Sequence, residues 1–291
     1  MKNFPNIYII GTAKAATSSL ADYLNLYNEV CIGSLKEPHY WSENFPTSRL
    51  KILITEKKAH KYLKAYNSTC ENRIDASTSY ICSHHASKNI GKMEAVKIIL
   101  IVRDPVDRYI SHYRNDYSSG VETRSLKHTI FMETNGEVEK YSYFDYGRYF
   151  THLKRWTKSV KENSILCLDY DTLIKSPEKV LNEIMNFLEI EYNPCFIFPK
   201  NNQAFIPRNK LWMKFMQMHK VRMIVRSVMP QCLKILLRNR FIYRLGKNVI
   251  TEEDECRVML LKRYNTEIKN FAKLVKEVSS IGEFKFMEKY D

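Results

Sequence analysis

Ile9-Ile10-Gly11-Thr12-Ala13-Lys14-Ala15-Ala16-Thr17-Ser18-Ser19-Leu20 runs from apolar residues through small ones into an amphipathic stretch. A strand is predicted from Asn6 to Ile10, and apolar residues three and four positions apart predict a helix from about Thr17 to Tyr27. Amides at a helix N-terminus attract an anion, and small residues let the backbone approach it. The segment therefore predicts a phosphate-binding loop, with Gly11, Thr12, Lys14, Ala15, Ala16, Thr17 and Ser18 as its binding residues.

This loop differs from the P-loop of ATPases and GTPases. That motif is G-x-x-x-x-G-K-[ST], in which the lysine directly precedes the hydroxyl residue. Here Lys14 lies in mid-loop, and Ala16-Thr17 stands where Gly-Lys would be. The displacement argues against an ordinary nucleoside triphosphatase and favours a P-loop-like anion site. A tight turn with a solvated lysine is the alternative for this segment alone.

Two later segments repeat the order of strand, loop and helix. Ala95 to Val102 is a nearly continuous apolar run, typical of a central strand buried on both faces, and Pro105 suits a first helical turn. Ser164 to Tyr170 predicts another strand, and Ser176-Pro177 begins an amphipathic helix. The alternation predicts an α/β fold with a central parallel sheet and flanking helices.

The pattern changes after Phe198, where strand signals stop and helical ones continue. A helix is predicted from Thr251 to Val278, and its buried face is expected to contain Leu260, Tyr264, Ile268, Phe271 and Val275. We expect one domain over residues 1–291. It would consist of an α/β core at about 5–198 and a basic helical C-terminal lobe at about 199–291.

The charge of the chain is unevenly distributed. Formal net charge is +14, and no Asp or Glu occurs from Tyr192 through Thr251. The basic residues of this acid-free stretch are Lys200, Arg208, Lys210, Lys214, Lys220, Arg222, Arg226, Lys234, Arg238, Arg240, Arg244 and Lys247. An anionic partner is expected. The stretch would meet a polyanionic acceptor or a membrane surface, unless it pairs with acids of the core.

Cysteine spacing and hydropathy bear on the compartment. The seven cysteines are scattered, with no C-x-x-C and no Cys/His pairing of the kind that binds zinc, so neither a disulfide framework nor a zinc site is indicated. No run reaches the roughly 18 to 20 apolar residues that span a bilayer. The first ten residues are too short and interrupted for a signal peptide. We therefore expect reduced thiols, no metal and a cytoplasmic protein, with peripheral membrane contact as an option.

A second anion site follows the strand at Ala95 to Val102. The sequence there is Arg103-Asp104-Pro105-Val106-Asp107-Arg108-Tyr109-Ile110-Ser111. An arginine at the strand end and a serine eight residues further on form a plausible charge-assisted clamp for phosphate. Either residue alone would more often belong to a surface cluster at a helix start.

Both candidate sites carry the motifs of a known enzyme family. Sulfotransferases that use 3′-phosphoadenylyl sulfate (PAPS), above all those that modify carbohydrates, have the loop G-x-x-K-[AGS]-G-T-[TS]-x-L. Lys14, Thr17, Ser18 and Leu20 match it, and Ala16 replaces its glycine. The family's R-x-P-x-x-R-x-x-S signature is complete at Arg103 to Ser111. The sequence therefore resembles this family, in a bacterial form.

The resemblance implies roles for these residues. The first loop would hold the 5′-phosphosulfate of PAPS, and Arg103 with Ser111 would hold the 3′-phosphate. The resemblance extends over most of residues 5–210, including Tyr146-Gly147-Arg148-Tyr149 and the segment from Asn201 to Arg208. This last segment adds Arg208 to the expected nucleotide-binding residues.

A third segment, Lys36-Glu37-Pro38-His39-Tyr40-Trp41, resembles the K-E-[PTV]-H-[FY]-[FW] segment of heparan-type sulfotransferases, whose glutamate is the proposed base. An acceptor hydroxyl is a poor nucleophile until a base takes its proton. Glu37 is the expected base and His39 the alternative, because imidazole titrates near neutral pH. Lys36 and His39 are also expected at the acceptor. A solvated Lys-Glu pair is the ordinary alternative.

Asp75 and Ser77 lie where relatives carry a [GE]-x-S-x-x-Y segment that lines the acceptor cleft. Asp75 could therefore contact the sugar, position Lys14, or cap a turn.

The predicted reaction is in-line transfer of a sulfuryl group from PAPS to a hydroxyl of a polysaccharide, glycolipid or lipid-linked sugar, with Glu37, Lys14 and His39 as catalytic residues. No metal is predicted, because no set of carboxylates suited to Mg²⁺ is recognisable. A kinase on a degenerate P-loop is one alternative. A basic module for nucleic acid or membrane is another, but such a module has no need of Lys14, Glu37 and Arg103 together. We expect no nucleic-acid partner.

Overall fold

The computed structural model describes residues 4–35, 37–42, 56–66, 70–137, 142–161, 163–192, 206–207, 242–243 and 250–290. The chain forms two compact units. Unit 1 comprises Met1–Arg108, Lys140–Lys200 and Arg263–Asp291, and unit 2 comprises Tyr109–Glu139 and Asn201–Lys262.

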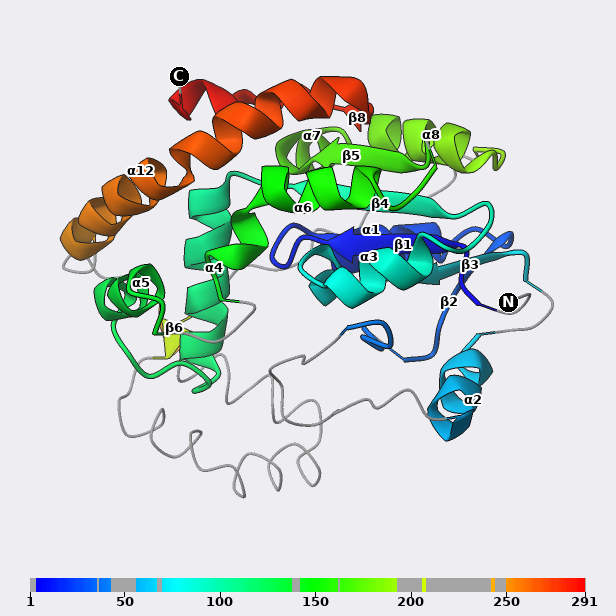
Figure 1. Ribbon diagram of the computed structural model, residues 1–291, viewed down its shortest axis with the longest axis horizontal. Helices are drawn as coiled ribbons and strands as arrows, with labels where there is room; N and C mark the ends of the chain where they lie inside the picture. Colours follow the sequence, from blue (N-terminus) through cyan, green and yellow to red (C-terminus); the bar gives the residue numbers. More distant parts are fainter. Residues whose placement is uncertain are drawn as a thin grey trace. The chain divides into compact units, whose positions relative to one another are not determined.

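A six-stranded parallel sheet is the centre of unit 1 (Figure 1). Its strand order is β2-β3-β1-β4-β5-β8, and each neighbouring pair is parallel. The strands are β1 (Ile7–Gly11), β2 (Val30–Ile32), β3 (Asn72–Asp75), β4 (Lys97–Val102), β5 (Ile165–Asp169) and β8 (Ser279–Ile281). The predicted parallel sheet is confirmed, and so are the predicted strands around β1, β4 and β5.

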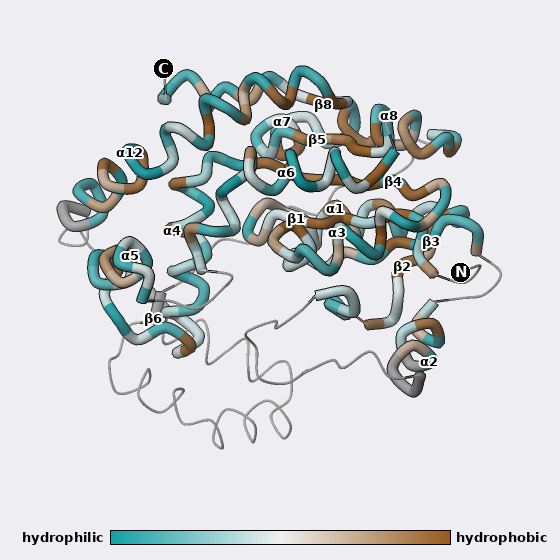
Figure 2. The backbone as a smooth tube through the Cα atoms, in the orientation of Figure 1, coloured by the Kyte–Doolittle hydropathy of each residue, from teal (hydrophilic) through white to brown (hydrophobic). Residues whose placement is uncertain are grey.

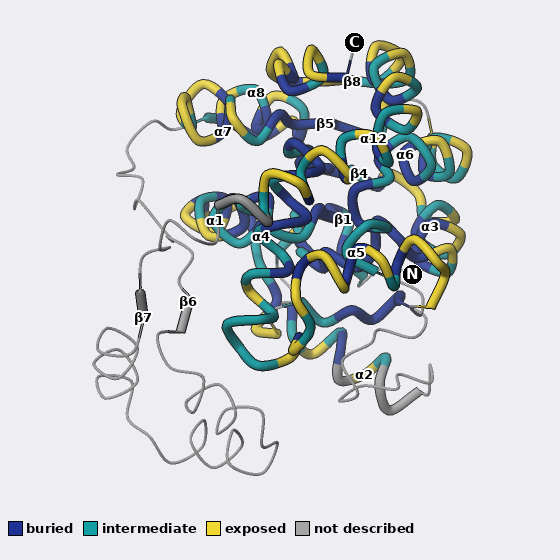
Figure 3. Tube along the Cα trace, turned by 90° about the vertical axis from the view of Figure 1, so that its left-hand side faces the viewer, coloured by how far each residue is buried: buried dark blue, intermediate teal, exposed yellow. Residues whose placement is uncertain are grey.

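Helices cover both faces of this sheet, because its central strands are apolar on both sides. All five residues of β1 and of β5 are buried. The helices of unit 1 include α1 (Thr17–Leu24), α3 (His84–Ile90), α6 (Tyr149–Thr157), α7 (Tyr170–Lys175) and α8 (Pro177–Leu188). Figure 3 shows α1, α7 and α8 on one side of the sheet and α3 and α6 on the other.

The core on the α1 and α8 side follows the period-2 alternation of the strands. Ile9, Ile99 and Leu168 pack in one buried cluster with Leu20 of α1 and Ile184 of α8. These strands and helix faces form the apolar interior in Figure 2. Burial of such side chains supplies roughly 1.5–3 kcal/mol each, so this layer holds the strand ends in register.

Turns and caps then direct the chain at the carboxyl ends of the strands. Asp104 caps α4 (Pro105–Ser118): its Oδ1 accepts from the amides of Val106 (2.9 Å) and Asp107 (3.2 Å). Pro105 at the first helical position lacks the amide that would be unpaired there. Three further elements, η1 (Thr78–Ile81), α2 (Glu56–Lys64) and η2 (Asp145–Gly147), complete the part of unit 1 around the site.

The C-terminal segment differs from the prediction, because it returns to the sheet. After α12 (Ile250–Leu274) and η4 (Val275–Glu277), β8 pairs with β5. The expectation that no strand follows Phe198 was therefore wrong. Two of the three residues of β8 are exposed, so it has no apolar pattern by which it could be recognised. The predicted buried face is confirmed in unit 1, where Tyr264, Ile268, Phe271 and Val275 are buried. The last element is η5 (Lys285–Tyr290).

Unit 2 contains most of α4, α5 (Leu126–Thr134), the first part of α12, and a two-stranded antiparallel pair of β6 (Ile206–Pro207) and β7 (Ile242–Tyr243). Within it, Glu253 of α12 pairs with Arg114 of α4 and with Arg257 one turn further on. Nearly all of the basic stretch predicted to guide an acceptor lies outside the described residues. Among the helices that are described, none combines the length and apolarity of a membrane span.

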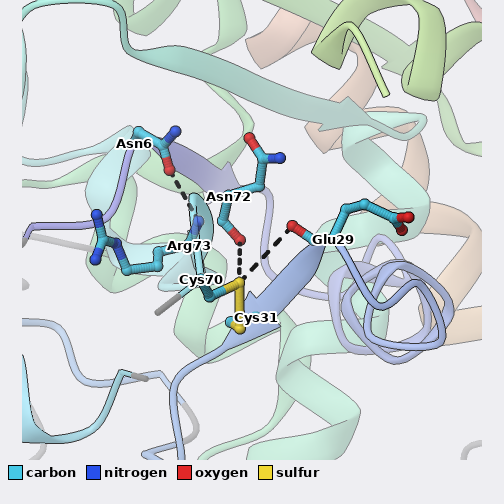
Figure 4. The surroundings of a disulfide bond; sticks show 6 residues. All are labelled: Asn6, Glu29, Cys31, Cys70, Asn72 and Arg73. Carbon is cyan, nitrogen blue, oxygen red and sulfur yellow. Dashed lines mark hydrogen bonds between the residues drawn. A yellow bond between two sulfur atoms is a disulfide. The ribbon is translucent and has the colours of Figure 1, made fainter. Parts of the chain in front are cut away.

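Cys31 and Cys70 form a disulfide (Figure 4). Cys31 lies in β2 and Cys70 just before β3, and the parallel pairing of these strands brings their Cα atoms to 6.2 Å. The expectation of reduced thiols was therefore wrong for this pair. The two positions are 39 residues apart, and only the strand pairing makes them neighbours. Of the other cysteines in the described part of the chain, Cys82, Cys167 and Cys256 are buried and are not in a disulfide.

Candidate functional site

Three chain segments meet at the carboxyl edge of the sheet. β1 lies between β3 and β4, so the loop after Gly11, the end of β3 at Asp75 and the residue after β4, Arg103, are neighbours. In open parallel sheets this edge is where ligands bind, since the loops that follow adjacent strands converge there. The structure brings together predicted residues that lie between positions 11 and 103 of the sequence.

The loop after β1 has the backbone of an anion site. The amide of Thr12 donates to Ile101 O of β4 at 3.1 Å, and the amide of Ala15 donates to Thr12 O at 3.2 Å. Lys14 and Ala16 adopt left-handed φ angles of 70° and 60°, and Ala16 is the N-cap residue of α1. The first amides of a helix have no partner within it, so those from Thr17 onward are donors suited to a phosphate.

Two predicted residues of this loop serve its shape. Thr12 is buried and its Oγ1 donates to Tyr146 O at 2.9 Å, so this hydroxyl is engaged by η2. Gly11 lies against η1: a Cβ there would be 3.1 Å from the side chain of Ile81. Ala15 is fully buried. Lys14 and Ser18 are partly exposed, whereas Thr17 is buried at the start of α1.

Arg103 contacts the same loop. Its Nη1 donates to Lys14 O at 2.8 Å, and its guanidinium lies over the ring of Tyr170 at 4.6 Å from the ring centroid. The hydroxyl of Tyr149 donates to Arg103 O at 2.8 Å. The two predicted phosphate-binding segments are therefore one connected structure. Ser111, the other half of the predicted clamp, lies on α4 in unit 2.

Arg108, the second arginine of the same motif, is fully buried. It donates to Tyr143 O, and its guanidinium lies 5.9 Å from the ring centroid of Tyr146. Because Tyr146 O in turn accepts from Thr12, Arg108 supports the segment that fixes the loop. The sequence motif thus contains Arg103, which lies at the site, and Arg108, which supports the segment that holds the loop.

The loop of residues 37–42, which follows β2, carries the candidate base. Glu37 and His39 flank Pro38 with left-handed φ angles of 48° and 49°. Non-glycine residues in this region are strained, and such strain is concentrated at functional sites. The Glu37 carboxylate is held at Oε2 by the hydroxyl of Thr78 at 3.2 Å and lies 3.3 Å from Nε2 of His39.

His39 is the more enclosed of the two candidates. The exposed fraction of its side chain is 10%, against 29% for Glu37. Its Nδ1 lies 2.7 Å from Ser79 Oγ, which is 2.5 Å from Ser42 Oγ. Both ring nitrogens of His39 therefore have partners within the loop and η1, and the Glu37 carboxylate is better placed to meet an acceptor.

Asp75 lies behind this loop and is 1% exposed. Its carboxylate accepts from Ser77 Oγ (2.6 Å), Tyr62 OH (2.6 Å) and Tyr80 OH (2.8 Å). Burial raises the pKa of Asp75, although the three hydroxyl donors act in the opposite direction. Ser77 is also fully buried. Both residues were predicted to line an acceptor cleft, and the structure places them one layer behind the Glu37 loop.

Lys36 and Arg208, also predicted for the site, lie outside the described residues. Conversely, sequence reasoning gave no role to Thr78, Ser79, Tyr80 or Tyr62. Thr78, Ser79 and Tyr80 belong to η1, and Tyr80 is the last residue of the [GE]-x-S-x-x-Y match, so their proximity in sequence to Asp75 and Ser77 was the available signal. Tyr62 on α2 carried no such signal.

One buried group combines ligand types that metals use. Within the described part of the chain, Cys82, Asp145 and His152 offer ligand atoms within 4.8 Å of one another. Arg155 donates to Nδ1 of His152 at 3.2 Å, so the ring proton is on Nε2, which donates to Asp145 O at 2.8 Å. The imidazole thus has no lone pair toward the cluster, and we assign no metal to it. The expectation that the protein needs no metal stays a prediction.

Fold and site together define an α/β protein in which a loop suited to phosphate follows β1, an arginine is hydrogen-bonded to that loop, and a carboxylate is held by η1, against which the loop begins. The family model described as "Sulfotransferase domain" matches residues 4–222, so the chain belongs to the sulfotransferase domain family. The resemblance to this family that was drawn from the motifs is confirmed, and its bacterial form stays a prediction.

Curated relatives and a solved structure agree with this. The chain is 26% identical over 200 residues to mouse heparan sulfate glucosamine 3-O-sulfotransferase 3A1, covering 65% of this chain and 47% of that protein. It is 24% identical over 247 residues to human bifunctional heparan sulfate N-deacetylase/N-sulfotransferase 1, covering 77% and 26%. The chain thus spans about half or less of these relatives. A sulfotransferase from Alicyclobacillus acidocaldarius shares the fold, with a TM-score of 0.60, 21% identity, and coverage of 69% and 86%.

Proposed function

We propose that this protein is a sulfotransferase that transfers the sulfuryl group of PAPS to a hydroxyl of a carbohydrate. Membership of the sulfotransferase domain family supports the reaction class. The names of its relatives, which act on heparan sulfate, support a sugar acceptor. A polysaccharide, a glycolipid and a lipid-linked sugar are the forms that we consider.

The donor would occupy the loop after β1. Amides at the start of α1, with Lys14 and Ser18, suit the 5′-phosphosulfate, and Arg103 suits the 3′-phosphate. Preorganised donors of this kind stabilise charge that develops on a leaving group. Because Arg103 donates to Lys14 O, the two halves of the donor site would be formed together.

The transfer is a single displacement at sulfur. The acceptor oxygen forms a bond to sulfur while the bond from sulfur to the bridging phosphate oxygen breaks. Adenosine 3′,5′-bisphosphate leaves with that electron pair, and the acceptor proton passes to the Glu37 carboxylate. Lys14 would neutralise charge on the leaving group, and His39 would hold Glu37.

One observation carries this proposal: η1 joins the donor loop to the base. Gly11, which begins the donor loop, packs against Ile81 at one end of η1, and Thr78 at the other end donates to Glu37. This supports a carboxylate near the loop that we propose for the donor, which is the arrangement that sulfuryl transfer to a hydroxyl needs. A nucleotide-binding module without transfer activity would not need it.

The experiment is an acceptor panel with radiolabelled PAPS: heparan sulfate, N-sulfated heparosan, chitosan oligosaccharides and an uncharged glucan. We expect label on a sugar with the wild type and strongly reduced label with Lys14→Ala. A parallel arm with γ-labelled ATP tests the kinase alternative. Transfer from ATP, or no transfer from PAPS to any sugar, would overturn the proposal.

A further inference from the structure

Three residues whose hydroxyl groups donate to Asp75 also contact three consecutive residues of the Glu37 loop, two through the hydroxyl and one through its ring. Ser77 Oγ accepts from the amide of His39 at 3.0 Å. The ring of Tyr62 stacks on the ring of Tyr40, with centroids 4.2 Å apart and planes 6° from parallel. Tyr80 OH accepts from the amide of Trp41 at 3.3 Å. These contacts link one buried carboxylate to positions 39, 40 and 41.

Asp75 influences the Glu37 loop by setting the direction in which each of these hydroxyl groups donates its hydrogen bond. A hydroxyl has one proton and two lone pairs. Ser77 and Tyr80 donate their protons to Asp75, so the lone pairs of both oxygens remain for the amides of His39 and Trp41. Tyr62 also donates to Asp75, which fixes the plane of the ring on which Tyr40 lies. Without an acceptor at position 75, these hydroxyls would be free to rotate.

The loop needs such support because its backbone is strained. Glu37 and His39 hold left-handed φ angles without being glycine, and each such residue costs roughly 1–2 kcal/mol. A strained conformation persists only where its surroundings over-determine it. The contacts at positions 39 to 41 begin directly after this strained pair and so hold the loop in place.

We propose that Asp75 is the positioning residue of the Glu37 loop: by accepting hydrogen bonds from the hydroxyls of Ser77, Tyr62 and Tyr80, it fixes residues 39–41 and, through them, the carboxylate of Glu37. This role rests on the proposed function, in which Glu37 is the base. Asp75 is too deeply buried to touch an acceptor, so it acts on the reaction through Glu37 alone.

The test is a double-mutant cycle between Asp75→Asn and Glu37→Gln. It is measured as kcat with radiolabelled PAPS and the panel sugar of highest turnover. A misplacement of about 1 Å can reduce a rate about 10²-fold, and we expect this loss in Asp75→Asn. Affinity for adenosine 3′,5′-bisphosphate, measured by calorimetry, should stay within about twofold, because the donor loop is unchanged. In the Glu37→Gln background, Asp75→Asn should cause no further loss.

The outcomes separate the two proposals. If Glu37→Gln has the kcat of the wild type, Glu37 is not the base, and the proposed role of Asp75 is overturned with it. A defective Glu37→Gln in which Asp75→Asn causes its full loss again would overturn the positioning role and leave the base in place. Wild-type kcat in Asp75→Asn would also overturn it.

Two milder variants keep the test decisive if Asp75→Asn does not fold. Ser77→Ala removes the acceptor for His39 N, and Tyr80→Phe removes the acceptor for Trp41 N. Each should lower kcat at constant nucleotide affinity. Ser87→Ala is the matched control, because Ser87 is equally buried and donates to His84 O on α3, away from the loop. A loss of kcat in Ser87→Ala equal to that in Ser77→Ala would overturn the proposal.

Discussion

Arg103 donates a hydrogen bond from Nη1 to the carbonyl oxygen of Lys14, 2.8 Å away and 89 positions earlier in the chain. A residue expected to bind the 3′-phosphate thus also holds the loop that is proposed to face the reacting sulfur. Arg103→Ala should weaken binding of adenosine 3′,5′-bisphosphate by about 10- to 100-fold, since hydrogen bonds to charged groups contribute roughly 1.5–3 kcal/mol. It should also lower kcat.

The effects of Arg103→Ala and Lys14→Ala should be less than additive, because both act on one loop. Calorimetry with the bisphosphate and steady-state kinetics measure the two effects. Unchanged nucleotide affinity in Arg103→Ala would remove the phosphate clamp from the mechanism, and unchanged kcat would remove the link to Lys14.

Glu37→Gln should retain nucleotide binding and lose turnover by roughly 10²–10⁴, the usual contribution of a general base. His39→Gln should lose less, because His39 contacts Glu37 at 3.3 Å and is itself enclosed by Ser79. The measurement is kcat with PAPS and the panel sugar of highest turnover. If Glu37→Gln is as active as the wild type while His39→Gln is inactive, His39 is the base.

Ala16 occupies a left-handed position, with φ 60° and ψ 22°. The family motif has glycine there, and glycine adopts this conformation without the penalty of roughly 1–2 kcal/mol that other residues incur. Its greater freedom in the unfolded chain offsets about 0.4–1 kcal/mol. Ala16→Gly should therefore stabilise the protein by up to about 1 kcal/mol in urea unfolding. The control is Ala15→Gly, which removes a fully buried methyl group at ordinary φ and should destabilise. Equal destabilisation by both changes would contradict the explanation.

Much of this site could be predicted because it lies in short motifs that directly follow strands. Lys14, Glu37 and Arg103 follow β1, β2 and β4, which together with β3 are four adjacent parallel strands, so the topology alone brings these residues to one edge of the sheet. The support behind them could not be predicted. Tyr62 reaches Asp75 from a separate helix, and a single tyrosine in an amphipathic pattern does not indicate its partner.

Pairings between distant residues were missed for the same reason. Cys31 with Cys70 and Cys82 with His152 are neighbours only after the sheet and its helices have formed. β8 was missed because its stability comes from pairing with β5, which a polar three-residue segment does not reveal.

The buried imidazole of His152 should make the stability of the folded protein sensitive to acid. Burial, reinforced by Arg155, lowers the pKa of His152 from 6.5 to about 3. At a pH between about 3 and 6.5, His152 is therefore protonated in the unfolded chain and neutral in the folded chain. The free energy of unfolding should therefore fall as the pH falls from 6.5 toward 3, by up to about 1.4 kcal/mol per unit. Urea unfolding of wild type and His152→Gln at pH 7, 6 and 5 measures this. The wild type should show the steeper decline, and equal slopes would contradict the assignment.

The Cys31–Cys70 disulfide closes a loop that contains the strained residues Glu37 and His39. Closing a loop of this length stabilises the folded state by about 4 kcal/mol in the chain-entropy account. Reduction with dithiothreitol should therefore lower the urea midpoint of the wild type. The double variant Cys31→Ser, Cys70→Ser should be equally destabilised and insensitive to dithiothreitol, which separates the bridge from other effects of the reductant. Mass spectrometry of an unreduced digest should find the two peptides joined. Separate peptides, together with a midpoint that dithiothreitol does not move, would show that both thiols are free in solution.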